Sequence, residues 1–157
     1  MNEQITVRKA TLDDLPKLFD FEKGIINTER PFDPTLKDED IHYYDLEQMI
    51  TDPQVQVVVA EFDNELIGSG YARIQSSKPY LKHQKYAFLG FMYVAEAYRG
   101  KGINRKILEA LRDWSVAQNI TEFRLEVYND NLPAIKAYEK TGFKKHMIVM
   151  RMGLNDI

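Results

Sequence analysis

The chain of 157 residues contains no cysteine, and this absence excludes several kinds of chemistry. Without a thiol the protein forms no disulfide, no thiolate metal site and no covalent acyl-cysteine intermediate. Only three histidines are present, and they are scattered along the chain without the spacing of a metal-binding motif. We therefore expect no bound metal.

Long apolar runs and a strong charge of one sign are absent as well. No run approaches the roughly 20 apolar residues that span a membrane, and the first residues lack the charged and apolar regions of a signal peptide. The formal net charge of -3 provides no basic excess for binding nucleic acid. These observations favour a cytoplasmic protein whose partners are neither a membrane nor a nucleic acid.

Hydrophobic periodicity predicts one α/β domain over residues 1–157, with about six or seven strands and about four helices. The expected strands cover residues 5–8, 55–62, 66–74, 88–94, 122–128 and 144–154, and the expected helices cover residues 11–24, 38–51, 103–117 and 132–140. Asp63-Asn64-Glu65 predicts a hairpin turn. Gly68 and Gly70 indicate a bulge or a close neighbouring backbone in the strand that follows.

The stretch from Phe88 to Ala117 is the most informative part of the chain. It begins with apolar and aromatic residues up to Val94, as expected for a strand buried on both faces. A basic loop with glycines at 100 and 102 follows, and it opens directly into an amphipathic helix. The stretch therefore predicts a central strand, a tight turn and a helix in succession.

The turn before this helix has the features of an anion site. The first N–H groups of a helix lack partners and lie at the positive end of its dipole. Gly100 and Gly102 let a phosphate approach the main chain closely. Four basic side chains add positive potential: Arg99, Lys101, Arg105 and Lys106. The glycines are equally compatible with tight turn geometry alone, and neither the Walker pattern nor the dinucleotide fingerprint fits this loop.

Two motifs resemble those of the GNAT superfamily of N-acetyltransferases. The run Arg99-Gly100-Lys101-Gly102-Ile103-Asn104 is similar to its signature of Arg or Gln, two residues, Gly, one residue, and Gly or Ala. Asn104 departs from the last position. The segment from Leu125 to Phe143 is similar to the second hallmark of the family, with Asn131, Ala134 and Tyr138 in place.

The resemblance implies a single-domain GNAT acyl-CoA N-acyltransferase fold, with a mixed central sheet splayed around an acetyl-CoA site. It implies that the pyrophosphate of the cosubstrate lies on the turn and that its pantetheine arm pairs with the end of the central strand. The cofactor-binding residues would be Met92, Tyr93, Val94, Arg99, Gly100, Lys101, Gly102, Ile103, Asn104, Arg105 and Asn131. Asn131 is equally explained as a helix cap.

The same resemblance implies acetyl transfer to a primary amine of a small molecule or peptide by direct attack, with a backbone amide polarising the thioester carbonyl. Tyr138 matches the tyrosine that protonates the departing thiolate, and its alternative is a helix tyrosine that only packs. Glu126 is a candidate base, because ribosomal-protein N-terminal acetyltransferases have a glutamate at a similar spacing. A structural role for Glu126 remains open.

The segment between the first two strands would form part of the acceptor site if the family pattern holds. Its candidate contacts are Glu22, Glu29, Arg30, Phe32, His42, Tyr43 and Tyr44, each of which could instead pack or face water. Two competing functions stay open: a non-catalytic acyl-CoA-binding module and a toxin-like aminoacyl-tRNA acetyltransferase. The acidic balance disfavours the second. Family members are often dimers, so a homodimer is compatible with the resemblance.

Overall fold

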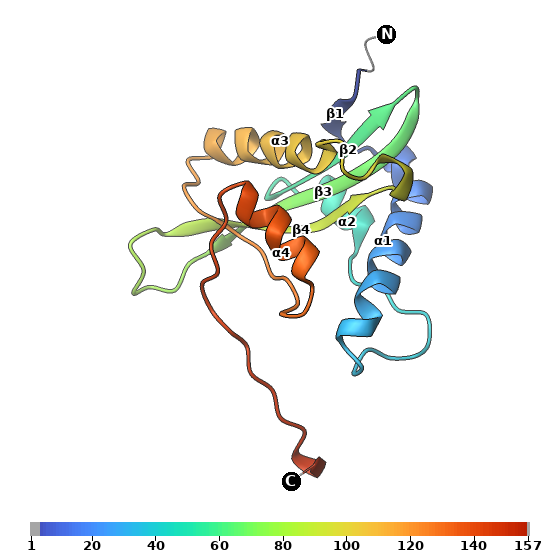
Figure 1. Ribbon diagram of the computed structural model, residues 1–157. Coiled ribbons are helices and arrows are strands. Elements are labelled where there is room, and N and C mark those ends of the chain that lie inside the picture. The colour runs from blue at the N-terminus through green and yellow to red at the C-terminus, as the bar shows by residue number, and fades with distance from the viewer. Residues whose placement is uncertain (1–3, 157) are drawn as a thin grey trace. The chain divides into compact units, whose positions relative to one another are not determined.

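The computed structural model describes residues 4–156, and the chain divides into two compact units. The first unit ends at Glu126 and the second begins at Val127. Within the first unit, five strands form one sheet in the order β1-β2-β3-β4-β5 (Figure 1). The strands are β1 (Thr6–Lys9), β2 (Val55–Phe62), β3 (Glu65–Ser76), β4 (Lys85–Val94) and β5 (Phe123–Arg124). The helices are α1 (Leu15–Glu29), α2 (Leu46–Thr51) and α3 (Ile103–Ala117), and the second unit holds α4 (Leu132–Lys140).

The sheet is mixed and opens at one edge, as predicted. Strands β1 to β4 pair antiparallel with their neighbours, whereas β5 pairs parallel with β4 after the crossover through α3. The β4–β5 ladder consists of only two pairs, Ala87 with Phe123 and Phe88 with Arg124. The edge of β4 beyond Phe88 therefore has no strand partner on the β5 side among residues 4–156.

Helices cover both faces of the sheet. The core cluster joins side chains of α1 and α2, such as Leu18 and Met49, to β2, β3 and β4. On the other face α3 packs closely, because a Cβ atom on Gly70 would lie 2.7 Å from the side chain of Ile107. The register between β3 and β4 shifts between Ser69 and Tyr71. Both a bulge and a close neighbour are thus present, as the glycines of β3 predicted.

Several local predictions are confirmed. Strand β2 has the predicted bounds, and α3 covers the predicted helix. Asp63 and Asn64 have φ values of 51° and 62°, the left-handed conformation of a tight hairpin turn between β2 and β3. Turn chemistry and apolar periodicity were therefore sufficient where structure is determined locally.

The prediction for the first two helices was wrong in extent. Helix α1 continues past Gly24 to Glu29, and Gly24 is a packing position inside it, because the Tyr93 ring occupies the space where a Cβ atom would lie. Buried side chains beyond that glycine also hold the extra turn against the core. Helix α2 begins only at Leu46, and the chain before it is a loop. Tertiary contacts overrode a helix stop in the first case and a helical pattern in the second.

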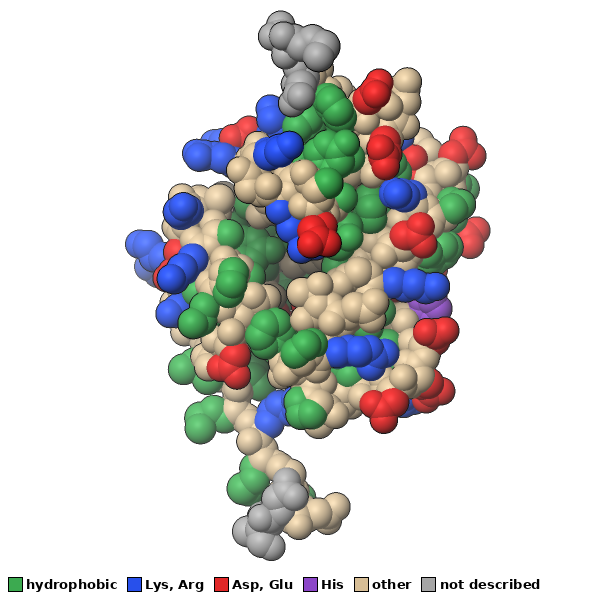
Figure 2. Space-filling model, turned by 45° about the vertical axis from the view of Figure 1, so that its right-hand side comes forward, with side chains coloured by type: hydrophobic (Ala, Val, Ile, Leu, Met, Phe, Trp, Pro, Cys, Tyr) green, Lys and Arg blue, Asp and Glu red, His purple; other side chains and the backbone are tan. Residues whose placement is uncertain are grey.

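One predicted strand was wrong in extent, and another does not form among the described residues. Only Phe123–Arg124 of the 122–128 strand pairs, because β4 changes register just beyond this point. Residues 144–153 form no strand, and hydrophobic side chains such as Met147 and Met150 are 81% and 90% exposed. Figure 2 shows hydrophobic side chains projecting along the segment that leads to the C-terminal end. A strand needs a neighbour for its backbone bonds, and no strand occurs among the described residues of the second unit.

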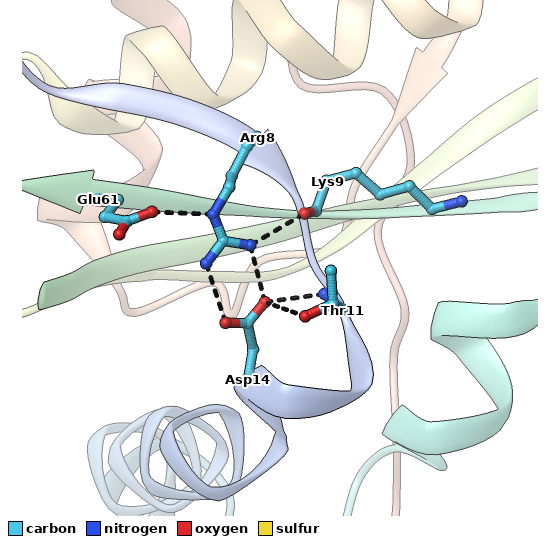
Figure 3. A network of polar contacts seen from close by, with 5 residues as sticks. All are labelled: Arg8, Lys9, Thr11, Asp14 and Glu61. Atoms are coloured by element: carbon cyan, nitrogen blue, oxygen red, sulfur yellow. Dashed lines mark hydrogen bonds and ion pairs between the residues drawn. The ribbon is translucent and has the colours of Figure 1, made fainter. Parts of the chain in front are cut away.

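A partly buried ion-pair network joins β1, β2 and the start of α1 (Figure 3). The guanidinium of Arg8 donates to both carboxylate oxygens of Asp14 at 2.9 and 3.0 Å, and its Nε donates to Glu61 at 2.8 Å. Asp14 also accepts from the Thr11 amide at 2.8 Å. The Arg8 bonds, aided by the Thr11 amide, lower the pKa of Asp14.

We predict that Asp14→Asn lowers the free energy of unfolding by about 1–3 kcal/mol at neutral pH, the usual cost of a lost charged hydrogen bond. Because the folded-state pKa of Asp14 is lowered, its contribution is present above the unfolded pKa of about 3.9 and is lost as pH falls through the folded value. Denaturant unfolding of parent and variant should therefore converge below about pH 4. Asp113→Asn, at an exposed position of α3, serves as the control. A difference that persists unchanged at low pH would contradict the assignment.

Candidate active site

A β-bulge in β4 lies at the centre of the site. Ser69 pairs with Tyr93 and Tyr71 pairs with Gly90, so two steps along β3 face three steps along β4. Phe91 accommodates the extra residue with φ of 55°, a conformation uncommon for a residue with a side chain. The Ser69 hydroxyl donates to the buried Phe91 carbonyl at 2.9 Å and holds the bulge. Sequence reasoning missed Phe91, although the paired glycines of β3 gave an indirect signal.

The glycine turn has the open geometry that a phosphate needs. Gly100 and Gly102 have φ of 77° and 79°, and a Cβ atom at either position would have no heavy atom within 4 Å. Helix α3 begins directly afterwards at Ile103 without a side-chain cap. Its first amides therefore line an open turn, whose geometry is compatible with the pyrophosphate that the resemblance implies.

The basic residues of the turn are arranged differently from one another. The Nε of Arg99 donates to the Val94 carbonyl at 2.9 Å, and its guanidinium lies 5.8 Å from the Tyr93 ring. Arg99 thus joins the turn to the end of β4, while its charge stays close to the turn. Arg105 and Lys106 are exposed on the first turn of α3. Asn104 is half-buried there.

The last residues of β4, Met92 to Val94, are half-buried, and Tyr93 among them packs on α1. The Tyr93 ring stacks on Phe21 with the centroids 4.8 Å apart. It also fills the space beside Gly24 of the same helix. These contacts fix the strand end whose outer edge has no partner strand.

A buried carboxylate organises the loop before α2. Glu22 is 1% exposed, and its Oε2 accepts from the amides of Tyr43 and Tyr44 at 2.9 and 3.0 Å. Its Oε1 lies 2.8 Å from Nδ1 of His42, which donates to the ionised carboxylate. A buried charge requires such partners. The expectation that Glu22 contacts substrate is therefore wrong: its oxygens bind the loop.

The loop places aromatic rings against the bulge. The Tyr44 ring centroid lies 5.2 Å from that of Phe91 and 5.8 Å from that of Tyr71. The Tyr43 ring contacts Tyr44 edge-on at 5.7 Å. Burial raises the pKa of both Tyr44 and Tyr71, so these phenols stay protonated at neutral pH. Three elements thus contribute to one aromatic cluster: the loop, β3 and β4.

Two carboxylates lie around this cluster. Glu29, at the end of α1, is half-buried; desolvation raises its pKa, and a hydrogen bond with Tyr43 opposes that rise. Glu126 is exposed, and its charge adds to the effect of burial that raises the pKa of Tyr71. Arg30 instead donates to the carbonyls of Lys37 and Glu39, so it supports the loop.

The second unit carries the other two predicted residues. The Asn131 side chain accepts from the Ala134 amide at 3.4 Å, so it caps α4. A helix cap was one of the two roles that the sequence left open for Asn131. Tyr138 is half-buried on α4, and its ring meets Phe143 edge-on at 5.7 Å. Gly142, with φ of 111°, follows the end of this helix. The helix thus has the local structure that the second motif predicted.

Among residues 4–156, no helix is long and apolar enough to cross a membrane. The same residues contain no cluster of three or more acidic, histidine or cysteine side chains that could hold a metal ion.

Comparison with known proteins identifies a family. The model of the acetyltransferase (GNAT) family matches residues 23–143. An N-alpha-acetyltransferase of Saccharolobus solfataricus is 28% identical over 145 residues, which cover 89% of this chain and 80% of that protein. The range matched by the family model includes both motifs described from the sequence.

Solved structures show the same fold. A predicted acetyltransferase from Clostridium acetobutylicum, crystallised with acetyl-CoA, has a TM-score of 0.71 at 20% identity, with 98% of this chain and 99% of that chain covered. An aminoglycoside antibiotic 6'-N-acetyltransferase from Acinetobacter haemolyticus has a TM-score of 0.76 at 17% identity, with 94% and 97% covered. The predicted fold class is thereby confirmed.

We predict that Glu22→Leu destabilises the protein by about 3–5 kcal/mol, because it leaves two buried amides without acceptors. Glu22→Gln should recover most of the loss. Its amide oxygen accepts from the same N–H groups, and its amide nitrogen donates to the other tautomer of His42. Denaturant unfolding measures the stability, and hydrogen exchange of the peptide around residues 42–45 locates the effect. Equal stability of the two variants would contradict this role.

Proposed function

Because the chain belongs to the acetyltransferase (GNAT) family, we propose that it transfers an acetyl group from acetyl-CoA to a primary amine of a small molecule or peptide. The observation that carries the proposal is the uncapped start of α3, with its open glycine cradle, directly after a strand whose outer edge is unpaired. The cosubstrate supplies an activated acetyl thioester when bound. The residues of the chain bind it, orient it and move the protons.

The donor site would use main-chain groups. The amides of residues 100–105 donate to the pyrophosphate, and Arg105 and Lys106 add positive charge. Met92, Tyr93 and Val94 offer their free backbone edge to the pantetheine amides, as an added strand would. Arg99 holds the two parts together through its bond to the Val94 carbonyl. The bulge at Phe91 exposes backbone amides of β4 that can polarise the thioester carbonyl.

The acceptor amine would approach from the side of Tyr44 and Tyr71. It must lose a proton before it attacks, and Glu126 is our candidate to take it. Its support is its exposure, which lets water carry the proton onward, and its charge, which acts on Tyr71 of the aromatic cluster. A backbone-polarised carbonyl and a neutral amine are sufficient for direct attack.

Tyr138 is our candidate general acid, which would give its phenolic proton to the departing thiolate. Its support is the match to the second motif and its half-buried position on a well-capped helix. Asn131, although it caps that helix through its oxygen, keeps its amide nitrogen to contact the cosubstrate.

The names of the relatives indicate only that the acceptor is an amine. The archaeal relative is named for acetylation of α-amines, and the Acinetobacter neighbour for acetylation of an aminoglycoside. These are amines on molecules of very different size and charge. A primary amine is the common element and the extent of our proposal here.

We predict that Gly102→Glu weakens acetyl-CoA binding at least about tenfold more than Gly102→Gln does, which corresponds to about 1.4 kcal/mol. Both variants place a side chain of equal size in the cradle, but only Glu repels the pyrophosphate. Calorimetric titration of parent and variants measures the difference, and thermal unfolding verifies that each is folded. No binding by the folded parent would overturn the donor site.

We predict that Tyr138→Phe lowers kcat about 100-fold or more while the affinity for acetyl-CoA changes less than about threefold, as expected for loss of a general acid. Steady-state turnover on an amine panel and calorimetry provide the two values. Tyr80→Phe, which alters a tyrosine that is 81% exposed, is the matched control. Unchanged turnover of Tyr138→Phe would remove this residue from the mechanism.

A further inference from the structure

Part of the sheet face that carries Tyr71 extends beyond the helices. Figure 1 shows α1 and α2 beside one end of the sheet, while the β3–β4 hairpin projects away from them. Residues directly opposite each other in a ladder share a face. Arg73 pairs with Phe88, and Phe88 in turn pairs with Arg124, so two arginines flank an aromatic ring in one row across three strands.

The next rows on this face are also polar and aromatic. Gln75 pairs with Tyr86, whose hydroxyl donates to the Gln75 side chain at 2.7 Å. In the opposite direction Tyr71 pairs with Gly90, and the Tyr71 ring covers Gly90 so closely that a Cβ atom there would lie 2.1 Å from it. Tyr71 belongs to the core cluster and Phe88 packs against it, whereas Arg73, Gln75 and Tyr86 are only half-buried. Polar groups at the rim of an aromatic cluster suit a small-molecule site.

The two arginines differ in their partners. Arg124 bonds to Glu122 and lies over the Tyr86 ring at 4.1 Å, so its charge is balanced. Arg73 is half-buried over the Tyr71 ring at 5.8 Å and donates to the Tyr71 hydroxyl. Among residues 4–156 it forms no ion pair.

The acid nearby does not neutralise Arg73. Asp52 accepts from the Gln54 amide at 2.8 Å and from the Gln48 side chain at 3.2 Å. The Gln54 bond is the main reason that the pKa of Asp52 is lowered, and Arg73 contributes last. A partly desolvated guanidinium held by a neutral phenol is complementary to a carboxylate, which it can bind through two parallel N–H groups.

An opposite charge acts on the same tyrosine. Both Arg73 and Glu126 interact electrostatically with Tyr71. Glu126 is the group to which the proposed function assigns the proton of the amine. Tyr71 therefore has a carboxylate suited to an ammonium group and a guanidinium suited to an anion, and this arrangement matches a molecule that carries both.

We propose that Arg73 binds a carboxylate of the acceptor, so that the substrates of this protein are amines that also carry a carboxylate, as amino acids do. This inference rests on the proposed function and specifies its substrate class. The rows of Tyr71 and Arg73 lie roughly 7 Å apart along the strand, which suits an acceptor whose charged groups are a few bonds apart. A polycationic amine without a carboxylate leaves Arg73 unpaired and adds positive charge beside it.

The test uses matched pairs of acceptors with acetyl-CoA and the full chain. Unbranched ω-amino acids of about two to six carbons are compared with n-alkylamines of the same length, and phenylalanine is compared with phenethylamine. For the parent we expect a KM at least about tenfold lower for the acid in the best pair. Arg73→Gln should remove this preference, so that both members of the pair have similar KM values. Arg73→Lys should restore part of it, because it keeps the charge without the planar fork.

Arg112→Gln, at an exposed position of α3, is the matched control and should keep the preference. Calorimetric titration with acetyl-CoA separates the two hypotheses. Turnover of acids and alkylamines with equal KM overturns the role of Arg73 and leaves the proposed function in place. Acetyl-CoA binding without turnover of any acid in these pairs overturns this inference alone, whereas failure of the folded parent to bind acetyl-CoA overturns the proposed function and this inference with it. Loss of the preference in Arg112→Gln as well overturns the assignment to Arg73.

Discussion

The arrangement of this site depends on the bulge at Phe91. The bond from the Ser69 hydroxyl to the Phe91 carbonyl is buried, and it stabilises a backbone conformation that a side-chain-bearing residue rarely adopts. The bulge follows directly after the two residues of β4 that pair with β5. Beyond the bulge, the edge of β4 has no strand partner on the β5 side among residues 4–156. Its backbone N–H and C=O groups are therefore available to a ligand. The same residue offers its ring to Tyr44 on the other side. One local irregularity thus serves both halves of the site.

Glu22 connects the helical layer to this irregularity. A carboxylate that is 1% exposed could be a large cost, but two backbone amides and His42 satisfy it. The loop that it holds carries Tyr44, whose ring reaches the bulge. A rigid acceptor side on a long loop requires some interaction of this kind, because loops have few backbone bonds of their own.

Structural features that depend on nearby residues were predicted correctly from the sequence. The predictions were wrong where contacts with residues distant in the sequence determine the structure. The hairpin at Asp63-Asn64, the strand β2 and the glycine turn before α3 follow from local residue chemistry, and the structure has all three. Gly24 does not stop α1 but provides space for the Tyr93 ring, which lies far away in sequence. The loop before α2 has a helical apolar pattern, but its amides are taken by Glu22.

The same limit explains the site residues. The open glycine turn could be predicted because a short motif contains it entirely. Arg73 could not, because its significance comes from its row with Phe88 and Arg124 across three strands, and strand register is not a local property of sequence. For Glu22 the sequence left substrate contact and packing both open, and its burial and hydrogen bonds show that it acts on the loop.

The charges of the first unit are segregated in a way that distinguishes the two substrates. The turn before α3 combines a helix N-terminus with exposed Arg105 and Lys106, and it favours a highly charged anion. Around Tyr71, by contrast, Arg73 is accompanied by Glu126. A pyrophosphate would gain less there, because the carboxylate opposes it, and an amine would gain little at the basic turn. The Nε of Arg99 donates to the Val94 carbonyl, so this guanidinium lies next to the glycine turn. The two regions therefore favour ligands of different charge, as the proposed assignment of a polyanionic donor and an amine acceptor to separate ends of β4 requires.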